Sequence, residues 1–97
     1  MTFRVTYTYT RPGDSVAFYD SVSAEAQSVI TSAQSDGRIE GTDQSSSGNT
    51  KTVTIDYRDE AARDSVRQEA AIVSHTEARD AYCAENGIQL DIAEQTF

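Results

Sequence analysis

Cysteine, histidine, proline and tryptophan are almost missing from this 97-residue sequence, which holds one of each of the first three and no tryptophan. With Cys83 alone, neither a disulfide framework nor a cysteine-based zinc cluster can form within the chain. No segment approaches the roughly 20 apolar residues of a membrane span, and residues 1–9 lack the apolar core of a signal peptide. We therefore expect a cytoplasmic protein that has no membrane partner.

Positive charge is also scarce in the sequence. Sixteen acidic residues stand against eight basic ones, which gives a formal net charge of −8 at pH 7. A surface of this sign repels the phosphate backbone, so we expect no nucleic acid as a partner. The length allows one domain, residues 1–97, and the hydrophobic content of 37% predicts a thin core that would gain from burial against a partner.

Alternating side chains predict the strands. Residues 3–9 place aromatic residues and valine on one side and arginine or threonine on the other, and residues 51–57 repeat this period of two. Weaker strands are predicted around residues 38–43 and 88–92. The polar residues 44–50 lie between two predicted strands and indicate a mobile hairpin loop.

Helices are predicted over residues 23–35 and 59–86. Ser23 is a good N-cap for the first helix and Gly37 is a natural stop, while Asp59 caps the start of the second.

Two points in the helical regions stay open. Residues 14–22 fit either an extension of the first helix or an apolar loop. In the second helix, Ser74 and Glu77 have the spacing of a capping box, so the segment is either continuous or broken near Val73.

The predicted order is therefore strand, helix, strand, strand, helix, strand. Two right-handed crossovers of this kind build one antiparallel sheet with both helices on the same face. We predict an α+β, ferredoxin-like βαββαβ fold with a four-stranded sheet, in which the strands at 3–9 and 51–57 are central.

Two reactive side chains have plain structural interpretations. His75 has no second ligand at metal-binding spacing and no evident orienting partner, so we interpret it as a surface residue or one in the first turn of a helix, without a chemical role. Cys83 has Arg79 one turn before it, which would lower the pKa of a thiol. A histidine near enough to activate it is missing, however, and a small apolar filler is the favoured interpretation.

The carboxylates of the second helix interleave with arginines, as in the i,i+3 pairs Glu60–Arg63 and Asp64–Arg67. This pattern indicates a solvated helix face and singles out no acid–base pair. No calcium loop, phosphate-binding loop or nucleophile elbow occurs in the sequence, so we predict no metal site, no cofactor and no identifiable catalytic residue.

Tyrosines form the remaining group of interest. Tyr7, Tyr9 and Tyr57 fall on the helix-facing side of the two central strands, and we interpret this layer as packed core. The alternative is that the layer lines a pocket for a small molecule of unknown identity. In that case Tyr7, Tyr57 and His75 are the candidate binding residues.

At this length, the order of elements resembles the dimeric α/β-barrel domains, a ferredoxin-like group that includes antibiotic-biosynthesis-type monooxygenases and related small isomerases. Monooxygenases of that group often use a Trp, Asn and His set, and this chain has no tryptophan, so that catalytic pattern is not carried over. A second resemblance, to small proteins of T4-like marine phages, implies no activity. It rests on Tyr-Thr-Tyr-Thr-Arg-Pro at 7–12, Val-Ala-Phe-Tyr at 16–19 and Asn-Gly-Ile at 86–88.

Two functions follow as hypotheses. The first is a non-enzymatic accessory or interaction protein that acts as a homodimer through its open sheet face, where Thr6, Thr8, Thr52 and Thr54 tolerate contact with another sheet. The second is a cofactor-independent enzyme, monooxygenase- or isomerase-like, with a pocket between helices and sheet. An enclosed pocket with convergent polar groups would favour the second, and a packed layer would exclude it.

Overall fold

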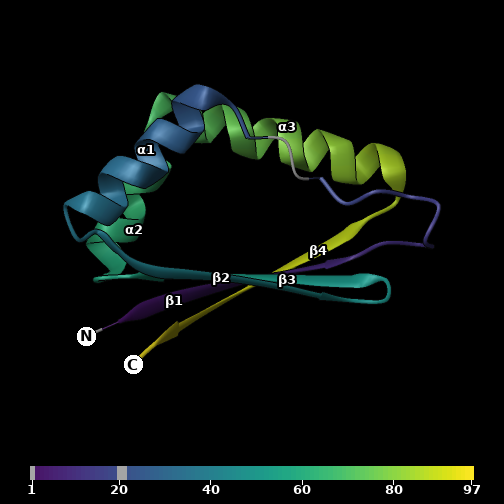
Figure 1. Cartoon of the computed structure of the whole chain (residues 1–97), viewed down its shortest axis with the longest axis horizontal. Coiled ribbons are helices and arrows are strands. Elements are labelled where there is room, and N and C mark those ends of the chain that lie inside the picture. Colours follow the sequence, from purple (N-terminus) through teal and green to yellow (C-terminus); the bar gives the residue numbers. More distant parts are fainter. Residues whose placement is uncertain (1, 20–21) are drawn as a thin grey trace.

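The computed structural model describes residues 2–19 and 22–97 of the chain. It contains one antiparallel sheet of four strands, in the order β2-β3-β1-β4, and three helices that all lie on the same face of that sheet (Figure 1). The elements in chain order are β1 (Phe3–Thr10), α1 (Ala24–Ser35), β2 (Ile39–Ser47), β3 (Thr50–Tyr57), α2 (Glu60–Arg67), α3 (Ala70–Asn86) and β4 (Gln89–Thr96). The predicted α+β, ferredoxin-like fold is confirmed.

The two central strands, β1 and β3, are those with the clearest alternating pattern in the sequence. β1 pairs with β3 on one side and with β4 on the other, and its helix-facing residues are all buried. Because cross-strand partners share a face, the register that sets Phe3 opposite Tyr57 and Val5 opposite Ile55 also directs the apolar side of β3 toward the helices. Val5 is fully buried and lies at the centre of the core.

The hairpin between β2 and β3 is tighter than the sequence predicts. Residues 44–47 belong to β2 and pair with β3, so the prediction of a mobile loop over residues 44–50 is wrong. The turn itself holds only Gly48 and Asn49, and Gly48 has a φ of 58°. A two-residue hairpin turn with glycine first is compatible with the twist of the strands, so the small polar residues before it remain extended.

The first helix begins and ends where its caps predict. The Ser23 side chain accepts a hydrogen bond from the Ala26 backbone N–H at 3.1 Å, and Gly37 follows the helix with a φ of 87°. Residues 14–19 contain neither helix nor strand, which resolves that part of the open region as a loop. Residues 20 and 21 of the same region lie outside the described residues.

The long helical segment is broken, but not near Val73. α2 ends at Arg67 and α3 starts at Ala70, so the break lies at residues 68–69. The Asp59 side chain caps α2 by accepting from the Ala62 backbone N–H at 2.7 Å. Val73 and the predicted capping-box serine that follows it lie inside α3, where the intrahelical hydrogen bonds already satisfy the backbone.

The helix layer crosses the sheet as an arch. α1 and α2 cover one end, and α3 runs above the sheet toward the other end, where Gly87 turns the chain into β4 with a φ of 68° (Figure 1). The last strand returns to the start of the first, and the Phe97 backbone N–H donates to the Thr2 carbonyl at 2.8 Å. None of the three helices has the length and apolar content needed to cross a membrane.

Candidate functional site

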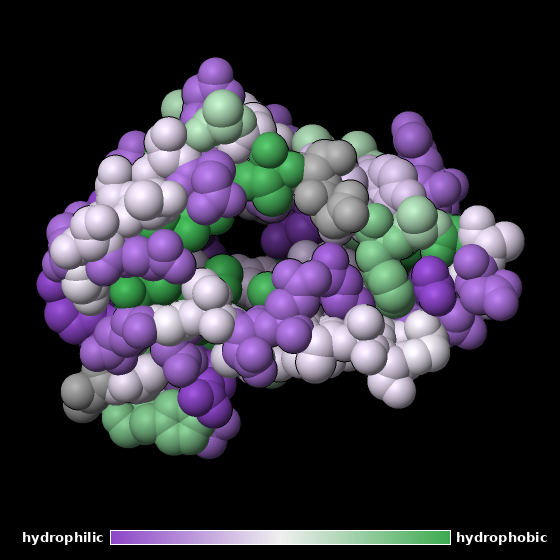
Figure 2. All heavy atoms as spheres, in the orientation of Figure 1, coloured by the Kyte–Doolittle hydropathy of each residue, from purple (hydrophilic) through white to green (hydrophobic). Residues whose placement is uncertain are grey.

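A cavity of about 1240 Å³ separates the middle of the helix layer from the sheet. It is visible as an opening between the two layers, bordered by both hydrophobic and hydrophilic side chains (Figure 2). The buried core contacts therefore do not fill the whole interlayer space, although the tyrosine layer does belong to the core as predicted. Tyr7, Tyr9 and Tyr57 are buried among the core residues and also line this cavity.

Most of the cavity wall is apolar. Ile30 from α1, Ile39 from β2, and Val53 and Ile55 from β3 form one half of the wall. Three further apolar side chains line the cavity although each is more than two-fifths exposed: Val22, Val73 and Ile92. Among the described residues, these are three of the four large hydrophobic side chains that are exposed, the fourth being Phe97. Most of the large apolar side chains that are exposed to solvent in the described residues therefore line this one cavity.

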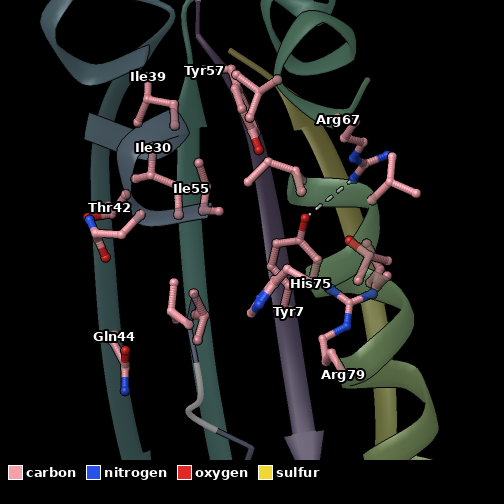
Figure 3. A pocket seen from close by; sticks show the side chains of 18 of the residues that line it. Tyr7, Ile30, Ile39, Thr42, Gln44, Ile55, Tyr57, Arg67, His75 and Arg79 are labelled. Atoms are coloured by element: carbon pink, nitrogen blue, oxygen red, sulfur yellow. Dashed lines mark hydrogen bonds between the residues drawn. The ribbon is translucent and has the colours of Figure 1, made fainter. Parts of the chain in front are cut away.

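The opposite half of the wall carries cations and a phenol. Arg67 at the end of α2 donates through Nη2 to the Tyr7 hydroxyl at 3.5 Å, and the Arg79 guanidinium lies over the Tyr7 ring, 5.5 Å from its centroid (Figure 3). Tyr7 therefore lies between two arginines from different helices. In Figure 3 the labelled β2 residues Thr42 and Gln44 lie across the cavity from this group.

Behind this group, a second arginine of α2 is held by three carboxylates. Arg63 is 9% exposed and forms ion pairs with Glu60 at 3.2 Å, with Asp64 at 2.7 Å and with Glu94 of β4. Its guanidinium also lies over the Phe3 ring, 4.8 Å from the centroid. The predicted Glu60–Arg63 pair is therefore present, but the arginine faces the sheet instead of solvent.

The interpretation of the second helical segment as a solvated face therefore holds for its carboxylates, which are exposed, but not for its arginines. Arg67 lies 3.5 Å from Glu94, whereas the structure pairs Asp64 with Arg63. Arg79 has only 10% of its side chain exposed. The stems of these arginines are long enough to cross the interlayer space, so their positive ends reach the sheet while their backbones stay on the helices.

His75 lies on α3 and lines the cavity beside the arginines, so the predicted surface residue is only partly exposed. It is half-buried, and its ring lies 5.8 Å from that of Tyr19, which in turn lies 5.3 Å from Tyr82. Burial and the nearby positive charge of Arg79 lower the pKa of His75 below its ordinary value. The imidazole is therefore neutral at pH 7 and can accept a proton.

Tyr57 lines the cavity from the β3 side and is 3% exposed. Burial raises the pKa of its phenol to about 12. The hydroxyl is therefore a neutral donor throughout the physiological range. The structure thus brings the three sequence-predicted residues Tyr7, Tyr57 and His75 to the wall of a single cavity.

Cys83 is buried in the core on α3, as expected for a small apolar filler. Burial raises the pKa of its thiol, and the opposing influence of Arg79 is smaller. Within residues 2–19 and 22–97, no three histidine, cysteine, aspartate or glutamate side chains gather in a way that could hold a metal ion.

Arg67 and Arg79 are the cavity residues that the sequence interpretation missed. A signal for Arg79 was present, because it falls one turn after His75 and one turn before Cys83, on the inward stripe of α3. Arg67 directly follows the buried Val66, at the last position of α2. The break that follows it, at residues 68–69, was not located from the sequence.

Solved structures show where this fold occurs elsewhere. A candidate antibiotic biosynthesis monooxygenase from Deinococcus radiodurans superposes with a TM-score of 0.57 at 12% identity, covering 98% of this chain and 91% of that one. Rv0793 from Mycobacterium tuberculosis superposes with a TM-score of 0.55 at 15% identity, covering 100% and 97% of the two chains. No protein-family model matches the sequence, and the search of curated proteins finds no match. The likeness to antibiotic-biosynthesis-monooxygenase topology is thus confirmed at the level of the fold.

Proposed function

We propose that this protein is a small-molecule-binding domain whose ligand, mostly apolar, occupies the cavity between the helices and the sheet. The observation that carries the proposal is the gathering of the exposed apolar side chains Val22, Val73 and Ile92 in one hollow. Exposed apolar surface is costly unless something covers it. The cavity volume of about 1240 Å³ exceeds the roughly 300–1000 Å³ typical of small-molecule sites, so a drug-sized ligand has room.

A neutral fluorescent probe tests this proposal directly. N-phenyl-1-naphthylamine is uncharged at pH 7 and brightens in apolar surroundings, so we expect saturable fluorescence enhancement with the wild-type protein. The substitution Ile30→Trp places a bulky ring in the cavity and should weaken binding at least about tenfold, which corresponds to roughly 1.4 kcal/mol. Thr31→Trp adds the same ring to the exposed side of α1 and should leave binding unchanged.

The single histidine supplies a second readout of the same experiment. Because His75 is the only histidine and lines the cavity, its ring protons report ligand contact in a proton NMR spectrum without further assignment. Probe binding that leaves these signals unmoved, or that survives Ile30→Trp, would place the probe outside the cavity and contradict the proposal.

Catalysis without a cofactor is a second candidate function. The observation that favours it is the neutral, half-buried imidazole of His75 in the same cavity as the Tyr7 phenol, an arrangement suited to moving a proton on a bound carbonyl compound. We expect the protein to accelerate exchange of the acidic C–H protons of 2-tetralone in deuterated water, followed by NMR. His75→Gln should abolish the acceleration, whereas equal exchange with and without protein would exclude this function for that ketone.

We also propose that the protein acts as a homodimer through the open face of its sheet. The open side of β1 and β3 carries uncharged threonines, and Thr6 lies at the centre of this face between Thr54 of β3 and Ala93 of β4. Of the charges on this face, Arg4 and Asp56 form an ion pair at 2.7 Å, while Asp43 lies opposite Thr54 and Asp91 lies opposite Thr8. The resemblance to dimeric α/β-barrel domains supports the same arrangement.

Light scattering after size exclusion measures the assembly. The proposal expects about twice the chain mass of 10.6 kDa, and a mass of one chain at all accessible concentrations would contradict it. Thr6→Glu would bury a charge in the interface and should shift the mass toward the monomer. Thr31→Glu adds the same charge to the exposed side of α1 and should leave the mass unchanged.

A further inference from the structure

The two halves of the cavity differ in chemistry. The half formed by α1, β2 and β3 presents Ile30, Ile39 and Ile55, whereas Arg67 and Arg79 enter from the opposite half (Figure 3). A ligand that lies across the cavity therefore meets hydrocarbon along its body and positive charge at one end.

The arginines at this end differ in how closely carboxylates contact them. Arg79 donates through Nε and Nη2 to Asp80 of its own helix, at 3.1 and 3.0 Å, and thus has a carboxylate of its own. Glu94 is shared, because the same oxygen that accepts from Arg63 is the one that lies 3.5 Å from Arg67. Arg67 is therefore the arginine of this group with the weakest partner.

The remaining donors of Arg67 are directed at no protein acceptor. Its Nη2 makes long contacts of 3.5 Å to Tyr7 and Glu94, and within the described residues its Nε and Nη1 have no hydrogen-bond partner. The side chain is 40% exposed, so water now solvates these groups. Two other acidic residues, Asp43 and Glu77, line the cavity, but both are exposed and their charges are screened by solvent.

We infer that the cavity selects an organic monocarboxylate, with the carboxylate bound by Arg67 and the Tyr7 hydroxyl and the apolar skeleton lying toward Ile30 and Ile55. This inference rests on the proposed function and names the ligand class for the same site. The planar guanidinium fork of Arg67 matches a carboxylate, and within the described residues its Nε and Nη1 are donors that no protein carboxylate engages. A doubly charged phosphate would leave a surplus of negative charge in a protein whose net charge is already −8.

A pair of isosteres tests the inference. 2-Naphthoate and the neutral 2-naphthamide have nearly the same shape, and each is measured by displacement of N-phenyl-1-naphthylamine from the wild-type protein. We expect naphthoate to bind at least about tenfold more tightly than naphthamide, the preference that a charge-assisted hydrogen bond supports. Arg67→Gln should remove this preference, so that the variant binds naphthoate and naphthamide with similar affinity.

A surface arginine provides the matched control. Arg58 is more than half exposed and pairs with the adjacent Asp59, so Arg58→Gln removes the same charge from the protein without touching the cavity. It should retain the full preference for naphthoate. If the wild type binds both compounds equally, or if Arg67→Gln keeps the preference, the selection of a carboxylate is wrong while the binding cavity stands. If the neutral probe itself fails to bind, the proposed function is wrong and this inference falls with it.

Discussion

The buried hydroxyl of Tyr57 should make the stability of the folded protein fall in alkaline solution. Its phenol has an ordinary pKa of 10.0, and burial raises this pKa to about 12 in the folded state. Between these values the unfolded chain ionises and the folded chain does not, so the folded state loses stability as the pH rises from about 10 to about 12. At pH 11 the loss is about 1.4 kcal/mol, the free energy of one pKa unit.

The substitution Tyr57→Phe removes the ionisable group and keeps the ring. No hydrogen bond of the Tyr57 hydroxyl is found among the described residues, so the variant should be nearly as stable as the wild type at pH 8. Urea unfolding followed by circular dichroism at pH 8 and pH 11 measures both proteins under both conditions. The wild type should lose about 1.4 kcal/mol more than the variant between the two pH values. Equal losses would refute the reasoning, because they would mean that the hydroxyl is solvated through the cavity and ionises normally.

Three further predictions concern the hairpin turn, the buried arginine and the histidine. Gly48→Ala forces an L-residue to adopt a positive φ and should lower the free energy of unfolding in urea by about 1–2 kcal/mol. Gly13→Ala, at a site with open space and no positive φ, should leave the free energy of unfolding nearly unchanged. Equal effects of the two substitutions would show that the turn relaxes. Arg63→Met should lower the free energy of unfolding by about 1–3 kcal/mol in the same assay. This is less than the loss expected when a fully buried ion pair is broken, because the carboxylate partners of Arg63 are exposed enough to be solvated again. An unchanged unfolding midpoint would mean that the ion pairs contribute nothing. His75→Ala should cost less than about 1 kcal/mol at pH 7.5. Because the folded-state pKa of His75 is lowered, wild-type stability should fall as the pH drops below about 6.5, and the variant should show a smaller fall. A larger fall in the variant would mean that the pKa of His75 is raised in the folded state.

The strands and caps were predictable because their causes are local. The alternation in residues 3–9, the N-cap at Ser23 and the positive-φ stop at Gly37 each depend on a few neighbouring residues, and each lies where the sequence predicts it. The hairpin was mispredicted because serines that carry no apolar pattern became strand once they paired with β3. Pairing with an ordered neighbour thus overrode weak strand propensity.

The cavity could not be predicted from the periodicity of the sequence. Alternation tells which side of β1 faces the helices, but not how far from the sheet the helices lie. The helix break at residues 68–69 and the long arginine side chains that reach from the helices to the sheet are both features that the alternation does not report. Tyr7, Tyr57 and His75 were selected from the sequence as one alternative, and their shared cavity wall depends on the separation that periodicity leaves undetermined.

The pairing of β1 with β4 has a consequence for the order in which the protein folds. It joins residues 3–10 to residues 89–96, so nearly the whole chain lies within the loop that this pairing closes. By contrast, β2 and β3 are linked by a turn of two residues. Closing the longer loop costs more entropy, and contacts distant in sequence slow folding, so we expect the β2–β3 hairpin to assemble early and β4 to dock last.

The same asymmetry should persist in the folded protein as a gradient of local opening. β4 is an edge strand held through β1 alone, whereas β3 is paired on both sides. Amide hydrogens of β4 should therefore exchange with solvent through smaller, more frequent openings than those of β3. Because Ile92 and Glu94 of β4 form one wall of the cavity, the wall that is last to assemble is also the wall that opens most readily.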